Sequence, residues 1–351
     1  MGKRSGGLTH IGELFSPKLI GQIKGPTPIQ KRLVEAAAAH IEQPDQRSIL
    51  YQHSVLCQTY LPYRNPGDDK REWDRLNGDV HLEVRAGKAM HPQERRLVQV
   101  GLPFGPKCRL VLMHINQLAL LSQSPRIEVE DSLTAFVRRV LKLDPKGRNI
   151  TDVKAQLARL SAADITLGIV RDDPSGTGTV GTTNYLRVVR DFDLWFPKNE
   201  HQRVLWPSVI DLSHDYFESL MSHAVPLDEH HIAALSHSAL ALDIYAWLAQ
   251  RLHRVPVNKP AFVSWGALHG QFGQGYNPEH MTKFRQVFKV ALKQVLALYQ
   301  KARITEDERR PPSLFIQGGK SVWREPAAKG LTLHNSPPPV ARRLQPVSGK
   351  A

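Results

Sequence analysis

The same order of helices and strands can be read twice along this 351-residue chain, and this repetition limits the possible folds more than any other feature. Each run is a helix, a strand, a helix, a turn, a helix and a β-hairpin. That order is typical of a winged helix, which is a helix-turn-helix with a hairpin appended. The two runs share no residue-level identity, so the repeat is one of architecture. The sequence therefore predicts an α+β fold with two tandem winged-helix domains.

Both runs are read from periodicity, since apolar residues recur at helical spacing or alternate along a strand. The first run has helices at Arg109–Leu121, Ser132–Leu143 (capped by Asp131) and Thr151–Ala162, a strand at Ile127–Val129, and hairpin strands at Asp164–Arg171 and Tyr185–Asp193. The second has a long helix from the cap Asp228 to Leu252, a strand at Ala261–Trp265, a helical turn at Gly266–Phe272, a turn at Gly273–Pro278, a helix at Glu279–Tyr299, and hairpin strands at Ala302–Glu306 and Gly330–His334.

Composition shifts suggest the domain limits. Residues 1–48 form a Gly- and Pro-rich, flexible N-terminal arm with a short helix at Ile29–Ile41, and residues 341–351 form a flexible C-terminal tail. We expect residues 49–225 to be the first winged-helix domain and residues 226–340 the second. Two further strands are expected at Val80–Arg85 and Arg96–Val100.

The charge is unevenly distributed. The chain has 47 Lys and Arg against 33 Asp and Glu, a net charge of +14, and residues 251–351 hold 17 of these bases and only five of the acids. A strongly basic surface attracts polyanions, of which nucleic acid is the commonest in a cell. The second domain is therefore expected to be the main DNA binder.

The helix at Glu279–Tyr299 divides into two faces. Its apolar side contains Phe284, Val287, Phe288, Ala291, Val295 and Leu298. A recognition helix needs an apolar face that packs against its own domain. Its opposite face needs polar and cationic side chains that contact base edges and phosphates. We expect Arg285 and Gln286 to contact guanine and adenine, and Lys289 and Lys293 to contact phosphates. The candidate DNA-binding residues of this helix are Thr282, Lys283, Arg285, Gln286, Lys289 and Lys293. An ordinary amphipathic surface helix is the alternative.

The corresponding helix of the first domain gives a weaker signal, because its charge is nearly balanced. The candidate DNA-binding residues there are Arg148, Asn149, Thr151, Lys154 and Arg159. A role mainly in protein–protein contact is an alternative for this helix, and an ordinary surface helix is an equal one.

Several motifs resemble nucleotide-binding, metal or catalytic signatures, but each lacks residues or neighbouring structure that such a site needs. Gly176–Gly181 matches G-x-G-x-x-G, but a strand pattern follows it where a dinucleotide site needs a helix. Gly318–Ser321 resembles the end of a phosphate-binding loop without its first glycine. The 16 histidines show no H-E-x-x-H pattern, and Cys57 and Cys108 are too few for a disulfide framework or a cysteine metal site. We therefore predict no enzyme activity, cofactor or metal.

No export or membrane-spanning segment is expected. The most apolar long stretch, Ala233–Gln250, contains Ser236, His237, Ser238 and Asp243, which a spanning helix would have to desolvate in hydrocarbon. This stretch is interpreted as a buried helix of a cytoplasmic protein.

Several segments together resemble the plasmid-encoded RepA replication initiators, over about residues 50–340. The longest are Phe192–Tyr216, with W-F-P-K and Q-R-V-L-W-P-S, and Ala224–Leu252, with A-L-D-I-Y-A-W-L-A-Q-R-L; the others are Leu50–Cys57, Gly105–Asn116, Asp131–Arg138 and Gly330–Val340. The segment Pro311–Lys329 departs from the family pattern and resembles an insertion in the second wing.

The resemblance implies a bacterial protein that binds repeated sites (iterons) in double-stranded plasmid origin DNA. It also implies opening of the adjacent duplex, recruitment of the host initiator and the replicative helicase, and self-association as a dimer. Three alternatives stay open: a winged-helix transcriptional repressor without a role in replication, a nuclease or nickase with an unrecognised site, and a general basic nucleic-acid chaperone.

Overall fold

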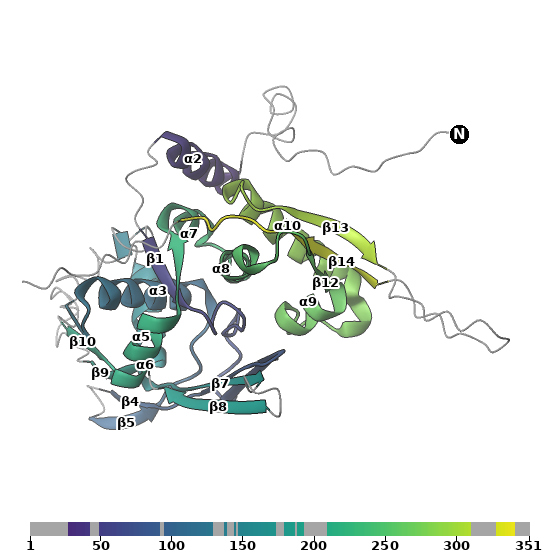
Figure 1. Ribbon diagram of the computed structural model, residues 1–351. Helices are drawn as coiled ribbons and strands as arrows, with labels where there is room; N and C mark the ends of the chain where they lie inside the picture. Colours follow the sequence, from purple (N-terminus) through teal and green to yellow (C-terminus); the bar gives the residue numbers. More distant parts are fainter. Residues whose placement is uncertain are drawn as a thin grey trace, which may run out of the picture.

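A computed structural model of the chain describes residues 27–42, 49–91, 95–128, 137–138, 144, 147–172, 179–186, 188–192, 209–309 and 328–340. Within these residues helices and small antiparallel sheets alternate, so the predicted α+β class is confirmed (Figure 1). In the part of the chain that is described, no helix has the length and apolar character needed to cross a lipid bilayer. The arm before residue 27, the tail after residue 340 and most of the expected helix Ser132–Leu143 lie outside the described residues.

The N-terminal half begins with one helix and a series of short strands. Its elements are α2 (Pro28–Glu42), β1 (Ile49–His53), β2 (Glu72–Asn77), β3 (Val80–Arg85), β4 (Lys88–His91), β5 (Arg96–Gln99), α3 (Gly105–Ser122), β6 (Arg126–Glu128), α5 (Gly147–Ala162), β7 (Asp164–Asp172), β8 (Thr179–Leu186), β9 (Val189–Phe192), β10 (Val209–Leu212) and α6 (His214–His223). The strands expected at Val80–Arg85 and Arg96–Val100 are therefore confirmed as β3 and β5.

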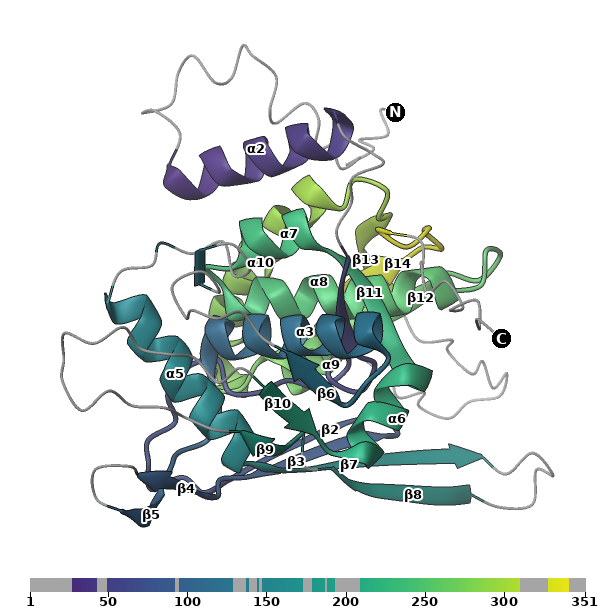
Figure 2. The same ribbon diagram turned by 90° about the vertical axis from the view of Figure 1, so that its left-hand side faces the viewer.

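The expected hairpin of the first half is present, but its second strand is not continuous. β7 and β8 pair from Ile165–Leu186 to Asp172–Thr179, in a four-stranded sheet of order β2-β3-β7-β8. In Figure 2 this sheet lies below α5 and α6. The chain then leaves the sheet, because Val188 and Val189 enter the core, each 1 % exposed. The strand predicted at Tyr185–Asp193 is therefore divided between β8 and β9, and β9 joins a different sheet of order β6-β10-β9.

The C-terminal half has the elements β11 (Ala224–Asp228), α7 (Glu229–Leu235), α8 (Ala239–Arg251), the 3₁₀ helix η3 (Leu252–Arg254), β12 (Ala261–Ser264), α9 (Trp265–Phe272), the 3₁₀ helix η4 (Pro278–His280), α10 (Met281–Leu298), β13 (Ile304–Arg309) and β14 (Ala328–Leu333). The three last strands form one antiparallel sheet of order β12-β14-β13. The segment 310–327 between β13 and β14, which contains most of the predicted insertion, lies outside the described residues.

The single long helix predicted from Asp228 to Leu252 is wrong, because two side chains cap two separate helices. The Asp228 carboxylate accepts from the backbone N–H groups of His230 and His231 and starts α7. The Ser238 hydroxyl accepts from the backbone N–H of Ala241 (3.2 Å) and starts α8. Since a capping side chain satisfies N–H groups that have no partner inside the helix, each cap begins a new helix.

The two halves share one continuous core. β1, in the N-terminal half, pairs with β11 from Ile49–Asp228 to His53–Ala224. α3 of the first half packs against α8 of the second, and α2 packs across α7 and α10 (Figures 1 and 2). The predicted boundary between residues 225 and 226 thus falls inside β11, and the division into domains stays a prediction.

A buried ion pair links the halves. Arg109, on α3, donates from Nε to Oδ1 and from Nη2 to Oδ2 of Asp243 on α8, both at 2.7 Å. The same guanidinium also donates to the carbonyls of Leu61 (2.6 Å) and Gly105 (2.8 Å). Burial raises the pKa of the Asp243 carboxyl, against the lowering influence of Arg109. Arg109 and Asp243 are 1 % and 5 % exposed, so this pair is a fixed internal connection.

Candidate nucleic-acid interface

Helix α10 has the two faces that the sequence predicts. Phe284, Phe288, Ala291, Leu292, Val295 and Leu298 are buried, whereas Thr282, Lys283, Gln286 and Lys293 are exposed. Of the predicted apolar positions only Val287 is intermediate in exposure. The polar side is therefore directed to solvent, as a helix that enters a DNA groove requires.

The apolar face of α10 packs against a cluster of aromatic rings, which we call the seat of α10. Trp265, the first residue of α9, meets Phe284 and Phe288 edge to face, with ring centroids 6.4 and 5.6 Å apart. Phe272 at the end of α9 lies 5.5 Å from Phe288 and 5.4 Å from Trp247 of α8. Such pairs contribute beyond the burial of their area and have a preferred geometry, so the rings fix α10 against α8 and α9.

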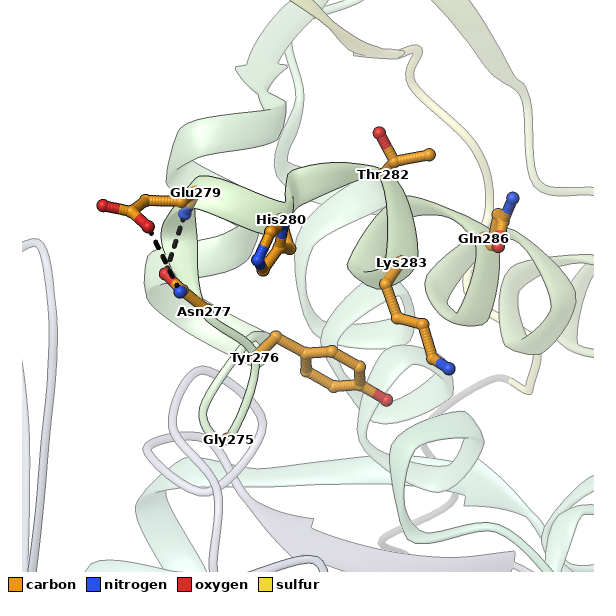
Figure 3. A pocket seen from close by; sticks show the side chains of 8 residues that line it. All are labelled: Gly275, Tyr276, Asn277, Glu279, His280, Thr282, Lys283 and Gln286. Carbon is orange, nitrogen blue, oxygen red and sulfur yellow. Dashed lines mark hydrogen bonds between the residues drawn. The ribbon is translucent and has the colours of Figure 1, made fainter.

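A hollow of about 630 Å³ lies beside the first turns of α10, and Figure 3 shows its lining. It is lined by Gly275, Tyr276, Asn277, Glu279, His280, Thr282, Lys283 and Gln286. Asn277 ends the turn from α9 by accepting from the backbone N–H of Glu279 (3.0 Å). Gly275 has φ +85°, a conformation that favours glycine, so it allows this tight turn. The turn thus brings three predicted DNA-binding residues, Thr282, Lys283 and Gln286, to one open hollow.

Arg285 and Lys289 are less free than the sequence suggested. The Arg285 guanidinium lies 5.9 Å from the Trp265 ring centroid, and its Nε is buried. Lys289 Nζ is 5.6 Å from the same centroid and forms an ion pair with Glu306 Oε2 of β13 at 2.7 Å. These contacts hold both side chains against the seat of the helix. Periodicity missed them because Trp265 and Glu306 are distant in sequence from both cations.

The candidate residues of α5 are dispersed. Arg148 and Thr151 are exposed, and the Thr151 hydroxyl donates to the Gly147 carbonyl (2.9 Å). The Asn149 amide donates to the carbonyl of Asp144. Lys154 is intermediate in exposure, and burial lowers the pKa of its ammonium group.

Arg159 has a structural position that does not fit the predicted DNA contact. Its Nη1 donates to the Leu102 carbonyl (3.0 Å), and its Nη2 pairs with Asp68 (3.1 Å). The guanidinium also lies 5.1 Å from the ring centroid of Phe104, and its side chain is 16 % exposed. Reaching a phosphate would break all three contacts. Arg148 is therefore the best-placed cation of this helix.

One serine and histidine lie together, but not in the arrangement of a nucleophile and its base. His53 Nε2 is 2.9 Å from Ser219 Oγ, and His53 Nδ1 accepts from the backbone N–H of Val55 (3.2 Å). A neutral ring that accepts at Nδ1 carries its proton at Nε2 and donates to the serine. This ring therefore cannot take the serine proton, as nucleophilic catalysis would require.

No cluster of three or more metal-ligating side chains occurs among the described residues. In the G-x-G-x-x-G match, Gly181 lies in strand β8, and no helix begins there. The glycines at 176 and 178, and the segment Gly318–Ser321, lie outside the described residues.

Residues 102–266, from just before α3 to the start of α9, match the family described as "Plasmid encoded RepA protein". Over these residues the chain is similar to that family. The predicted resemblance is thereby confirmed for the central part of the chain, whereas α10 and its exposed face lie beyond the matched residues.

Among solved structures, the chain is similar to domains 2 and 3 of RctB. One crystal structure, of RctB residues 155–483, has a TM-score of 0.46 and 10 % identity, over 80 % of this chain and 96 % of that one. A second, of selenomethionine derivatives of the same domains, has a TM-score of 0.47 and 9 % identity, over 79 % and 95 %. Likeness at this level carries no argument about function. A comparison with curated proteins finds no significant match.

Proposed function

We propose that this protein initiates plasmid replication by binding repeated sites in double-stranded origin DNA, with the exposed face of α10 in a major groove. The observation that carries this proposal is the exposure of Thr282, Gln286 and Lys293 on a helix whose opposite side is fixed by aromatic packing. Charge supports it, because residues 251–303 hold nine Lys and Arg against one acid, Glu279.

Each half is proposed to act as a winged helix. In the second half, the order α8, β12, α9, α10, β13, β14 and the strand order β12-β14-β13 support this assignment. In the first half, α3, β6, α5 and the hairpin β7–β8 occupy the corresponding places. We further propose that the protein acts in the bacterial cytoplasm without catalytic residues, opens the adjacent duplex, recruits the host initiator and helicase, and self-associates as a dimer.

Replacement of Gln286 with alanine is expected to remove base discrimination. Its amide is exposed at the hollow and can make a bidentate contact to adenine, so the loss should be about 1–3 kcal/mol at one base pair of the site. The measurement is a binding titration on the replicon's own origin fragment and on random duplex. Gln99→Ala, which removes an amide from β5, is the matched control. An equal loss on both DNAs would contradict the assignment of Gln286 to base reading.

Replacement of Lys293 with alanine should weaken binding to all sequences evenly. A phosphate contact has no base preference, so the slope of log K against log salt concentration should fall by about 1. The wild-type protein, with roughly six to ten phosphate contacts, should lose about 10³–10⁵ in affinity between about 50 and 200 mM salt. A Lys293 variant that loses affinity only for the origin fragment would place this residue at a base.

A footprint on the replicon tests the proposed function as a whole. Protection of repeated sites beside an AT-rich tract supports initiation, and protection at the promoter alone would favour the transcriptional repressor. Nicking of supercoiled origin DNA with Mg²⁺ would indicate a nuclease. Equal binding to origin and random duplex would indicate a nucleic-acid chaperone.

A further inference from the structure

Three stretches that are separated in sequence lie together where α10 ends and β13 begins. The Asn335 amide donates to the Val255 carbonyl (2.7 Å), and the His334 backbone N–H donates to the Arg303 carbonyl (3.0 Å). The Arg303 backbone N–H donates to the Ser336 hydroxyl (3.0 Å). These bonds hold residues 252–255, 303 and 334–336 together as one surface.

Five Lys and Arg residues lie on this surface or next to it in the chain, and we call them the basic corner. The basic corner consists of Arg251, Arg254, Lys259, Lys301 and Arg303, and all of them except Arg251 are exposed. None of the five forms an ion pair with a residue that the structure describes, in contrast to Arg85 with Glu83 and Lys107 with Asp152. Burial lowers the pKa of the Arg251 guanidinium, and its buried Nε has no hydrogen-bond partner in the described part of the chain.

Helix ends account for only part of this charge. Arg251 is the last residue of α8, Arg254 ends η3 directly after it, and Lys301 follows α10; cations at such helix ends interact favourably with the helix dipole. Lys259 lies in the loop before β12 and Arg303 directly before β13, so neither lies in the last turn of a helix. Like charges gathered without counter-charges repel one another, and a bound polyanion relieves that repulsion.

The basic corner is separate from the hollow that contains Gln286. The hollow lies beside the first turns of α10 and the corner lies beyond its last turn, and 18 helical residues span about 27 Å. Phosphates held at the corner are therefore different from those next to the bases that the first turns of α10 would read.

The chemistry of the corner favours double-stranded over single-stranded nucleic acid. Proteins that hold single strands stack the bases on exposed aromatic rings. Here the nearby aromatic side chain, Tyr299, is 2 % exposed, and its hydroxyl donates to the Pro337 carbonyl (2.7 Å). The large apolar side chain exposed in the loop is Val257, which offers no ring for stacking. Cations without stacking rings match the regular row of phosphates along a duplex.

We propose that the basic corner binds the phosphate backbone of duplex DNA outside the stretch that α10 reads. This inference rests on the proposed function of α10 and assigns the protein a second, sequence-independent contact with DNA. The corner would extend the footprint on one flank of each site and add to the salt dependence of binding, without adding base specificity.

The test compares two double variants of the full chain. Arg254→Gln with Arg303→Gln removes two charges from the corner, and Arg64→Gln with Lys88→Gln removes two exposed charges from the first half. Affinity for the origin fragment and for random duplex is measured over a series of salt concentrations. The corner variant is expected to lose up to about 60-fold at 0.1 M salt on both duplexes, with a slope reduced by about 2. The control should retain the wild-type slope.

Two further measurements identify which polyanion binds the basic corner. The footprint of the corner variant on the origin should shorten on one flank while discrimination between origin and random duplex persists. A wild-type slope and footprint in this variant, and in Lys259→Gln with Lys301→Gln, would overturn the inference. A loss confined to a single-stranded oligonucleotide or to polyglutamate would overturn it too, since the occupant would then be another polyanion. If the wild type showed no preference for origin DNA, the proposed function would be refuted. The affinity of the corner variant for random duplex would still test the basic corner.

Discussion

Replacement of Asp243 with alanine is expected to lower the free energy of unfolding by about 3–5 kcal/mol, because it leaves Arg109 as an unpaired charge inside the core. Both ends of the Asp243 carboxylate accept from the guanidinium at 2.7 Å, and both side chains lie far from solvent. Among the described residues, the carbonyls of Leu61, Pro62 and Gly105 would be left to accept from the cation, and none of them carries a charge. Urea unfolding monitored by circular dichroism measures this loss.

The control for this prediction is the apolar pair Arg109→Met with Asp243→Leu. Removing both charges avoids the unpaired ion, so the double variant should be more stable than Asp243→Ala despite carrying an extra substitution. If Asp243→Ala lost less than about 1 kcal/mol, the guanidinium would have found water, and the pair would not be the fixed connection described above.

The position of this pair has a consequence for DNA binding. Arg109 lies on α3 and Asp243 on α8, so the pair joins the half that contains α5 to the half that contains α10. Together with the pairing of β1 and β11 it holds the two helices at a fixed relation. Variants that weaken the pair should therefore reduce affinity for the origin even though neither residue reaches the surface.

Local patterns predicted the elements of the second half well. The burial of Phe284, Phe288 and Val295 and the exposure of Gln286 and Lys293 follow directly from 3.6-residue periodicity. The division of the expected long helix into α7 and α8 was missed, although Ser238 is a residue type that favours the N-cap position. Apolar residues continue through this break, so periodicity alone did not reveal it.

Side-chain contacts between segments that are distant in the chain could not be predicted from the sequence. Lys289 was assigned to a phosphate from its place on the helix, but Glu306 lies 17 positions further along the chain and pairs with it. Arg159 is a candidate DNA-binding residue from its place on α5, but it is held by Asp68 and Phe104. The buried Asp243 was visible as a polar residue in an apolar stretch, and only the fold identifies Arg109 as its partner. Such pairings depend on tertiary packing, which helix periodicity does not predict.

Acidification from pH 7 to pH 5 is expected to destabilise the protein through His53. Burial, with a smaller contribution from the nearby His223, lowers the pKa of this imidazole from 6.5 to about 3. The unfolded chain therefore binds a proton below pH 6.5 that the folded protein does not bind until about pH 3. Stability from this group is present above pH 6.5 and is lost as the pH falls, at about 1.4 kcal/mol per pH unit.

The difference between wild type and His53→Gln isolates this effect from carboxylates that titrate over the same range. His53 is 1 % exposed, packs against Tyr216 and His223, and has both ring nitrogens in contact with neutral groups. Among the described residues no carboxylate contributes to its pKa. Between pH 6.5 and pH 5 the wild type should lose about 2 kcal/mol more than the variant in urea unfolding. His237, whose pKa is also lowered by burial, is retained in both proteins and cancels in the comparison. Equal losses in the two proteins would mean that His53 gains its proton without cost, and would contradict the enclosure of its ring at the end of β1 against Ser219 of α6.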